Sequence, residues 1–157
     1  MVKGDFQREH CVNRECVPEL FNRLPWHDSK LRGICIQRRG EVDDIILDIE
    51  MWESMCDSMN KLVPVRIILE DASFFICDLD LRGKQACSDD ISSAECLMES
   101  ELKNKIQEER LPLSPVKLKE DALKDEFHFW FYLIPPGGTI DVIATNFKLI
   151  KNNDFDQ

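Results

Sequence analysis

The sequence predicts an α+β domain in which an antiparallel sheet of about six strands, built from hairpins, carries one main helix on one face. Two observations predict the sheet: apolar residues alternate with period two, and Gly-, Pro- and Asp-containing turns separate those runs. A third predicts the helix, because apolar residues recur at helical spacing over about residues 89–109. The 157 residues are expected to form a single domain with its own core.

The amino-terminal part is expected to contribute one short helix. Residues 1–16 are polar and irregular. Val17, Leu20 and Phe21 then recur at helical spacing, and Pro25 ends the pattern.

The next segments predict two hairpins. Residues 29–39 and 42–52 flank a turn at Gly40, and in the second of these runs apolar and acidic residues alternate. Residues 64–70 and 74–81 flank Asp71-Ala72-Ser73 and are expected to pair with each other.

The chain then changes to a helical pattern, with Ser92 and Glu95 as a candidate capping box. The apolar stripe of this expected helix contains Ile91, Ala94, Met98, Leu102 and Ile106. Residues 111–126 contain two prolines and a charged run, which predicts a long surface connection. Residues 151–157 form a polar tail.

The final hairpin is the richest in aromatic residues and turns at Pro135-Pro136-Gly137-Gly138. In its first arm, alternate residues are apolar and predict a core-facing side: Phe127, Phe129, Phe131 and Leu133. The opposite side carries His128, Trp130 and Tyr132, which form either a contact surface or packing beneath the helix.

Composition limits the classes of partner. Acids outnumber bases 30 to 20, and the formal net charge of -10 argues against nucleic acid and anionic membranes. The same charge favours a basic protein partner or none that is steered by charge. With no apolar membrane-spanning run and no signal-peptide pattern, the seven cysteines are expected to be thiols in the cytoplasm.

The candidate chemical groups are few, and neither a catalytic residue nor a cofactor is assigned. His27-Asp28 is half of a metal-hydrolase signature, or else hydrogen-bonds the entry to the first strand. His10, Cys11 and Cys16 have loose zinc-ligand spacing, whereas Cys35, Cys77 and Cys96 fit buried apolar positions. Two acid pairs would share one acidic face if their strands were adjacent: Asp48 with Glu50, and Asp78 with Asp80.

Three segments together carry a resemblance: LPWHDSKL, VRIILEDASFFICDLDL and HFWFYLIPPGGTIDVIA. Over roughly residues 24–147, the chain resembles a family of small uncharacterised bacterial proteins whose sheet opens with an HD-x-x-L segment, here His27 to Leu31. The opening is similar to immunity proteins encoded beside polymorphic bacterial toxins. That resemblance implies stoichiometric binding of a basic toxin without catalysis.

The sequence therefore favours a cytoplasmic, non-enzymatic binding protein, of which an immunity-type inhibitor is one form. Asp48, Glu50, Asp78 and Asp80 would attract the partner, and Trp130 or Tyr132 would anchor it. One alternative is a metal-dependent hydrolase that uses His27, Asp28 and His128 beside an acidic sheet face. Another is a homo-oligomer joined through an edge strand or the aromatic side of the last hairpin.

Overall fold

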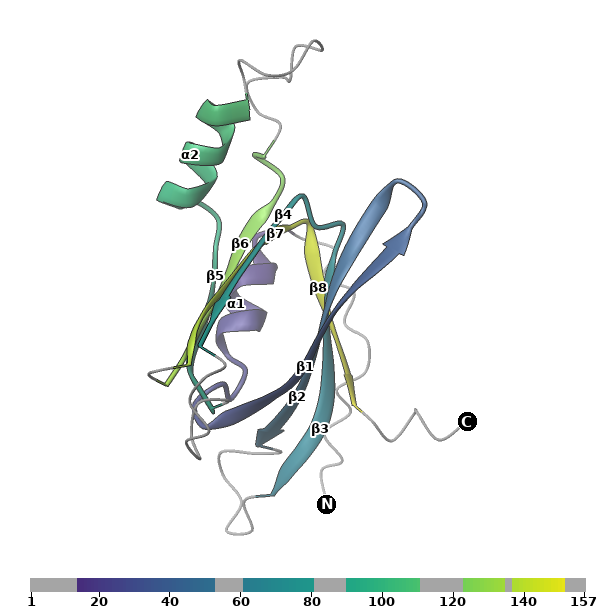
Figure 1. Ribbon diagram of the computed structural model, residues 1–157, viewed down its shortest axis with the longest axis vertical. Coiled ribbons are helices and arrows are strands. Elements are labelled where there is room, and N and C mark those ends of the chain that lie inside the picture. Colours follow the sequence, from purple (N-terminus) through teal and green to yellow (C-terminus); the bar gives the residue numbers. More distant parts are fainter. Residues whose placement is uncertain (1–13, 53–60, 81–89, 111–122, 135–136, 152–157) are drawn as a thin grey trace.

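The computed structural model describes residues 14–52, 61–80, 90–110, 123–134 and 137–151 (Figure 1). Within these ranges, eight antiparallel strands form one sheet, and two short helices accompany it. The helices are α1 (Cys16–Asn22) and α2 (Glu101–Arg110). The strands are β1 (Ser29–Arg39), β2 (Val42–Trp52), β3 (Leu62–Glu70), β4 (Phe74–Leu79), β5 (Asp90–Leu97), β6 (Phe127–Leu133), β7 (Gly138–Ala144) and β8 (Asn146–Lys151).

The sheet consists of two halves that face each other across the core. In the strand order β4-β7-β6-β5-β1-β2-β3-β8, we call β4-β7-β6-β5 the first half and β1-β2-β3-β8 the second half. The halves meet where β1 pairs briefly with β5, through Ser29 opposite Ile91 and Lys30 opposite Asp90. Beyond that point β1 pairs with β2 alone among the described strands, and their hairpin projects from the rest of the fold (Figure 1).

Two bends connect the halves a second time. The chain passes from β3 to β4 through residues 71–73, and from β7 to β8 through Thr145. These two bent segments pair with each other on both sides of the corner, β3 with β8 and β4 with β7. Backbone hydrogen bonds fix the corner, with the Thr145 N–H donating to the Glu70 carbonyl at 2.9 Å and the Ser73 N–H to the Ile143 carbonyl at 2.9 Å.

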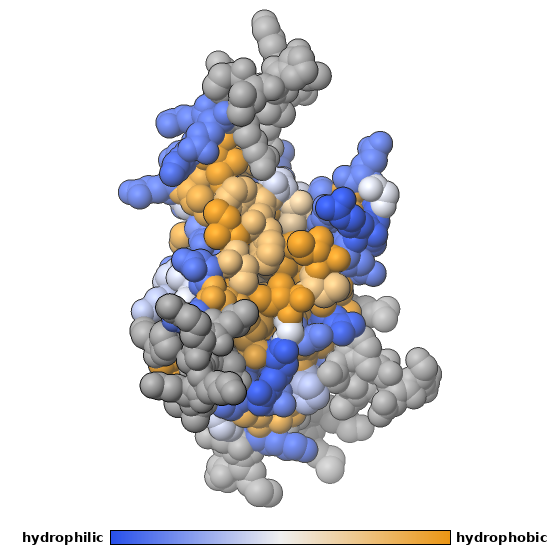
Figure 2. All heavy atoms as spheres, viewed as in Figure 1, coloured by the Kyte–Doolittle hydropathy of each residue, from blue (hydrophilic) through white to orange (hydrophobic). Residues whose placement is uncertain are grey.

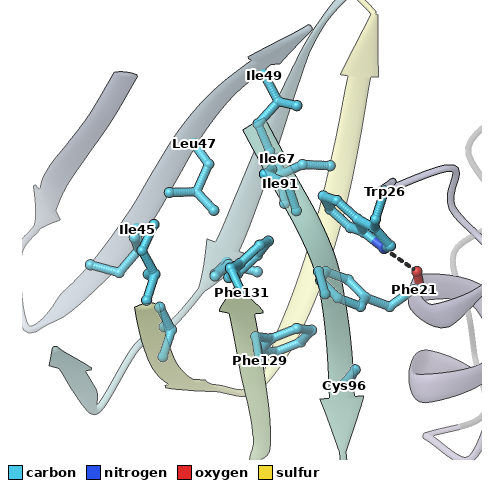
Figure 3. Close-up of a cluster of buried hydrophobic side chains, with 14 of the residues drawn as sticks. Phe21, Trp26, Ile45, Leu47, Ile49, Ile67, Ile91, Cys96, Phe129 and Phe131 are labelled. Carbon is cyan, nitrogen blue, oxygen red and sulfur yellow. Dashed lines mark hydrogen bonds between the residues drawn. The ribbon is translucent and has the colours of Figure 1, made fainter. Parts of the chain in front are cut away.

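The core lies between the two halves, and α1 contributes to it (Figure 1). Phe21 is fully buried, and its ring lies edge-on to those of Phe129 and Phe131. The Trp26 indole N–H donates to the Phe21 carbonyl at 2.8 Å (Figure 3). The predicted core-facing side of β6 is confirmed, because its residues are at most 2% exposed: Phe127, Phe129, Phe131 and Leu133.

The Asn22 side chain occupies part of the edge of β5 that β1 leaves. Its amide donates to the Cys96 carbonyl at 3.3 Å and accepts from the Cys96 N–H at 2.7 Å. One side chain thus satisfies two backbone groups of the kind that an adjacent strand would otherwise satisfy. The short helix is therefore attached to the sheet by polar contacts as well as by Phe21.

The predicted fold class is wrong in its strand number and in its main helix. Residues 90–97 are strand β5, so the candidate capping box at Ser92 and Glu95 does not exist, and α2 is confined to Glu101–Arg110. A register shift between Ile91 and Ser93 breaks the period-two pattern, which produced the helical spacing in the sequence. The Ser100 hydroxyl, at the start of α2, accepts a hydrogen bond from the Lys103 N–H at 3.1 Å.

The hairpin predictions have mixed outcomes. The β1–β2 and β6–β7 hairpins are confirmed; Gly40, at φ 66°, lies in the first turn, and Gly138, at φ 110°, begins β7. The hairpin predicted across Asp71 is wrong, because β3 pairs with β2 and β8 whereas β4 pairs with β7. The segments 1–13, 53–60, 111–122 and 152–157 lie outside the described residues, and with them much of the predicted connection and tail.

The surface is divided between polar and apolar regions. Figure 2 shows polar side chains over α2 and over the projecting hairpin, with an apolar region between them. None of the helices that the structure describes has the length and apolar character needed to cross a membrane.

Candidate functional site

The outer side of the first half carries two rows of cross-strand neighbours that α2 does not cover. Residues directly opposite each other in an antiparallel sheet share a face, so the register defines each row. We call these two rows the aromatic face. Across β5, β6, β7 and β4, the first row consists of Glu95, Trp130, Asp141 and Ile76. The second row consists of Ser93, Tyr132, Thr139 and Asp78.

Two aromatic rings form the centre of this face. Trp130 and Tyr132 are both half-buried, and their rings are stacked with centroids 5.9 Å apart and planes 19° apart. Carboxylates occupy both neighbouring strands, Glu95 on β5 and Asp141 on β7. Neither row contains a basic residue, so an apolar centre is bordered by negative charge.

The acids on this face are unequally engaged. Within the described chain, neither Glu95 nor Asp78 forms an ion pair, and both residues are exposed. Asp141 instead holds His128, with its Oδ1 2.8 Å from the ring Nε2. Glu95 and Asp78 are therefore the carboxylates most accessible to a partner.

The next row along the strands closes one end of the face. It contains Leu97, His128, Ile143 and Phe74. Ile106 of α2 and Leu123 form a small buried cluster with Ile143, and Phe74 packs against it. The His128 side chain is 8% exposed and hydrogen-bonds to Asp141, so it is a packed residue rather than part of an open surface.

Gly138 allows the edge strand β4 to join this face. A Cβ atom at this position would lie 1.9 Å from the Asp78 carbonyl oxygen, far inside van der Waals contact. The backbone φ of 110° also excludes most other residues. Gly138, the first residue of β7, thus allows β4 to pair closely with β7, which places Ile76 and Asp78 on the same face as the aromatic pair.

The outer side of the second half has a different character, and we call it the ion-paired face. Asp48 accepts two hydrogen bonds from the Arg66 guanidinium, at 2.7 and 3.2 Å. Glu50 pairs with Arg32 at 2.8 Å, and Glu70 pairs with Lys148 at 2.5 Å. The acids on this face are thus paired with basic residues of the same half of the sheet.

A buried carboxylate sits at the corner of the second half. Asp44 is 3% exposed and pairs with Arg39 at 2.7 Å, while the Asp71 N–H donates to it at 3.0 Å. Burial raises the pKa of Asp44. The hydrogen bonds from Arg39 and Asp71 and the positive charge of Arg39 together lower this pKa by more than burial raises it. The net pKa of Asp44 is below its ordinary value, so this group is charged at neutral pH.

The predicted acidic face does not form, because its two acid pairs are on different halves. Asp48 and Glu50 are on β2, whereas Asp78 is on β4 and Asp80 follows that strand. β2 and β4 are not neighbours in the sheet. Of the predicted binding residues, the structure places Asp78, Trp130 and Tyr132 on one face, with β7 between Asp78 and the two rings.

The groups of the alternative hydrolase site are also separated. Asp28 donates its N–H to Ile91 at one end of β5, whereas His128 lies opposite Leu97 at the other end. At about 3.3 Å per residue these ends are roughly 20 Å apart. His27 and Asp28 are exposed, with His27 Nδ1 3.7 Å from Asp28 Oδ1.

The predicted metal ligands and buried thiols are only partly described. His10 and Cys11 lie outside the described residues, and Cys16 begins α1. Within the described ranges, no group of three or more His, Cys, Asp or Glu could hold a metal ion. Cys35 and Cys77 are exposed, contrary to expectation, whereas Cys96 is buried on β5 and burial raises the pKa of its thiol to about 12.

Sequence reasoning missed five residues of the aromatic face: Ile76, Ser93, Glu95, Thr139 and Asp141. Counting outward from the Pro-Gly turn would have placed Asp141 opposite Trp130. No local pattern could have placed Glu95 or Ile76, because their strands join β6 and β7 from elsewhere in the chain. Comparisons with protein-family models, curated proteins and solved structures find no match to this chain.

Proposed function

We propose that this chain is a non-enzymatic, cytoplasmic binding protein that docks a basic protein on its aromatic face. The observation that carries the proposal is the Trp130–Tyr132 pair, which has carboxylates on both neighbouring strands and no basic residue in its two rows. Half-buried Trp and Tyr side chains on a rigid sheet are typical anchors of protein interfaces. A border of negative charge favours a positively charged partner.

The electrostatics of the whole chain support the same partner. The net charge of -10 attracts a basic protein over a distance of about 8–10 Å at ordinary ionic strength. On the ion-paired face the acids are compensated by Arg32, Arg66 and Lys148. The uncompensated charge of Glu95 and Asp78 would therefore direct the approach toward the aromatic pair.

An immunity-type inhibitor is the specific form of this function that we favour. The resemblance of the opening segment at His27 to Leu31 to immunity proteins implies stoichiometric inhibition of a basic toxin. In that form, the aromatic face would cover a basic surface of the toxin and remain bound to it. His27 and Asp28 would act in the fold, at the entry to β1, rather than in the contact.

The test is a capture experiment with identified partners. Tagged protein is incubated with lysate of its host at low salt, bound proteins are identified by mass spectrometry, and the purified partner is titrated against each variant. We expect a basic partner of defined stoichiometry whose association rate falls steeply as salt increases. The double variant Asp78→Asn, Glu95→Gln should slow association, and Trp130→Ala should speed dissociation.

The matched control removes the same charge elsewhere. Glu41 and Glu108 are exposed residues outside the aromatic face, so the variant Glu41→Gln, Glu108→Gln has the same net charge as the double variant. If the control weakens binding as much as Asp78→Asn, Glu95→Gln does, the proposed site is wrong. A partner whose binding is unaffected by Trp130→Ala would also contradict it.

A further inference from the structure

We infer that the aromatic face is specific for arginine: a guanidinium group of the partner stacks on Trp130 while Glu95 accepts its N–H hydrogen bonds. This inference rests on the proposed function and names the chemical group that the site would recognise. It requires an exposed aromatic surface and an available carboxylate at adjacent positions. The register of β5 and β6 provides both.

On β5, Glu95 is the carboxylate next to Trp130. Glu95 lies directly opposite Trp130, a position at which Cβ atoms are about 4.5–5.5 Å apart. It is exposed, and no cation within the described part of the chain pairs with it. A cation above the indole would therefore be within reach of both oxygens of Glu95.

The two acids that flank Trp130 differ in their contacts. Asp141, on the other side of Trp130, has one oxygen engaged by the buried His128 at 2.8 Å. Its side chain is only 20% exposed. Asp141 contributes negative charge from a fixed position, whereas Glu95 has both oxygens available for a bidentate contact.

Arginine and lysine differ in how they contact an aromatic ring and a carboxylate. A guanidinium is planar, stacks on aromatic rings and presents paired N–H donors that match a carboxylate. A lysine ammonium is compact and more strongly hydrated, so it gains less from contact with a half-buried aromatic ring. Trp is also the aromatic side chain that binds cations best. The pairing of Trp130 with Glu95 therefore favours arginine.

Three peptides of equal length test this inference: oligoarginine, oligolysine and oligocitrulline. Citrulline keeps the planar shape of arginine without its charge. Binding is measured by calorimetry, and the indole N–H resonance of Trp130, assigned with Trp130→Phe, reports whether the peptide reaches the ring. We expect oligoarginine to bind about 5- to 10-fold more tightly than oligolysine, and oligocitrulline not to bind.

Variants connect the preference to these residues. Trp130→Ala and Glu95→Gln should each bring the arginine-to-lysine affinity ratio close to one, and Trp130→Phe should restore part of it. Glu108→Gln, an exposed position on α2, should leave the ratio unchanged. A change in the ratio separates specific recognition from general attraction, because both cationic peptides carry the same charge.

The outcomes separate this inference from the proposed function. Equal binding of oligoarginine and oligolysine that shifts the Trp130 resonance overturns arginine specificity and leaves a basic docking site. An arginine preference that survives both Trp130→Ala and Glu95→Gln overturns the assignment to this face. If neither cationic peptide moves the resonance, the arginine inference fails, and the capture experiment then decides the proposed function by itself.

Discussion

The two outer sides of the sheet use acidic residues in opposite ways. On the ion-paired face, Asp48 and Glu50 lie beside arginines from the same half of the sheet. On the aromatic face, Glu95 lies directly opposite Trp130, Asp78 lies opposite Thr139 on the edge strand β4, and no described cation pairs with either acid. The role of a carboxylate on a sheet is thus defined by its cross-strand neighbours. The same residue type forms ion pairs within the fold on one side and is available to a partner on the other.

The largest expected effect separates the core from the aromatic face along a single strand. Phe129→Ala should lower the free energy of unfolding by about 3–5 kcal/mol, because it leaves a cavity among fully buried rings. Trp130→Ala, its neighbour on the outer side, should cost far less, because its ring is only half-buried. Urea unfolding of both variants measures the difference, and equal losses would mean that Trp130 serves the core.

The second prediction concerns a substitution that should disrupt the aromatic face and leave the ion-paired face intact. Gly138→Ala should destabilise the fold by more than about 1 kcal/mol, because the new Cβ would meet the Asp78 carbonyl and the positive φ is strained. Gly40→Ala is the control, since its φ is also positive but nothing lies within 4 Å. Hydrogen exchange should show lost protection in β4 with β2–β3 pairing retained. A loss no greater than that of Gly40→Ala would argue against close packing of β4 on β7.

The third prediction concerns pH. Because the pKa of Asp44 is lower in the folded state, its contribution to stability is present above its unfolded pKa of about 3.9 and lost as pH falls through the folded value. Asp44→Asn should cost about 1–3 kcal/mol at pH 7, where it weakens the contacts to Arg39 and the Asp71 N–H. Unfolding measured from pH 7 to about pH 2 should show a gap between the two proteins that is constant at first and narrows as pH falls below the unfolded pKa of about 3.9. A constant gap would mean that charge is not the cause.

The smallest expected effect is the coupling on the ion-paired face. A double-mutant cycle of Asp48→Asn and Arg66→Gln should give a coupling free energy of about 0.2–1 kcal/mol. Both side chains are about a third or more exposed, so water screens the pair.

Asp78→Asn and Glu95→Gln should each change the free energy of unfolding by less than about 0.5 kcal/mol. A larger loss from either would show that the aromatic face has a stabilising partner within the chain.

The local sequence pattern was sufficient to predict a strand and its buried side where the strand pairs with the next strand along the chain. The bounds of β1 and β2 follow from the alternation around Ile45, Leu47 and Ile49, and from the turn at Gly40. The side of β6 that enters the core followed from the same period. In both hairpins, every pairing residue is close in the chain, so the turn determines the register.

Local pattern failed where pairing is distant or irregular. In β5 the buried residues Ile91, Ala94 and Cys96 are spaced by three and then two, because the strand contains a register shift. Ile91 and Ala94, followed by Met98 and Leu102 at intervals of four, therefore have the spacing of an apolar helix face. The β3–β4 segment has the composition of a hairpin, but its turn is the corner between the two halves. Half of the aromatic face depends on these two regions and was therefore not predictable.

The paired bends have a consequence for how the molecule is made. Residues 62–79 complete their hydrogen bonding only with residues 138–151, a partner that is synthesised much later. Until then, β3 has β2 on one side and an unsatisfied backbone on the other, and β4 has no partner at all among the described strands. Such sequence-distant pairing slows folding, to about milliseconds or seconds in β-rich domains. During that interval the newly made chain would expose Ile76 and its neighbours on an open strand, and a chaperone or rapid completion of synthesis would protect it from aggregation.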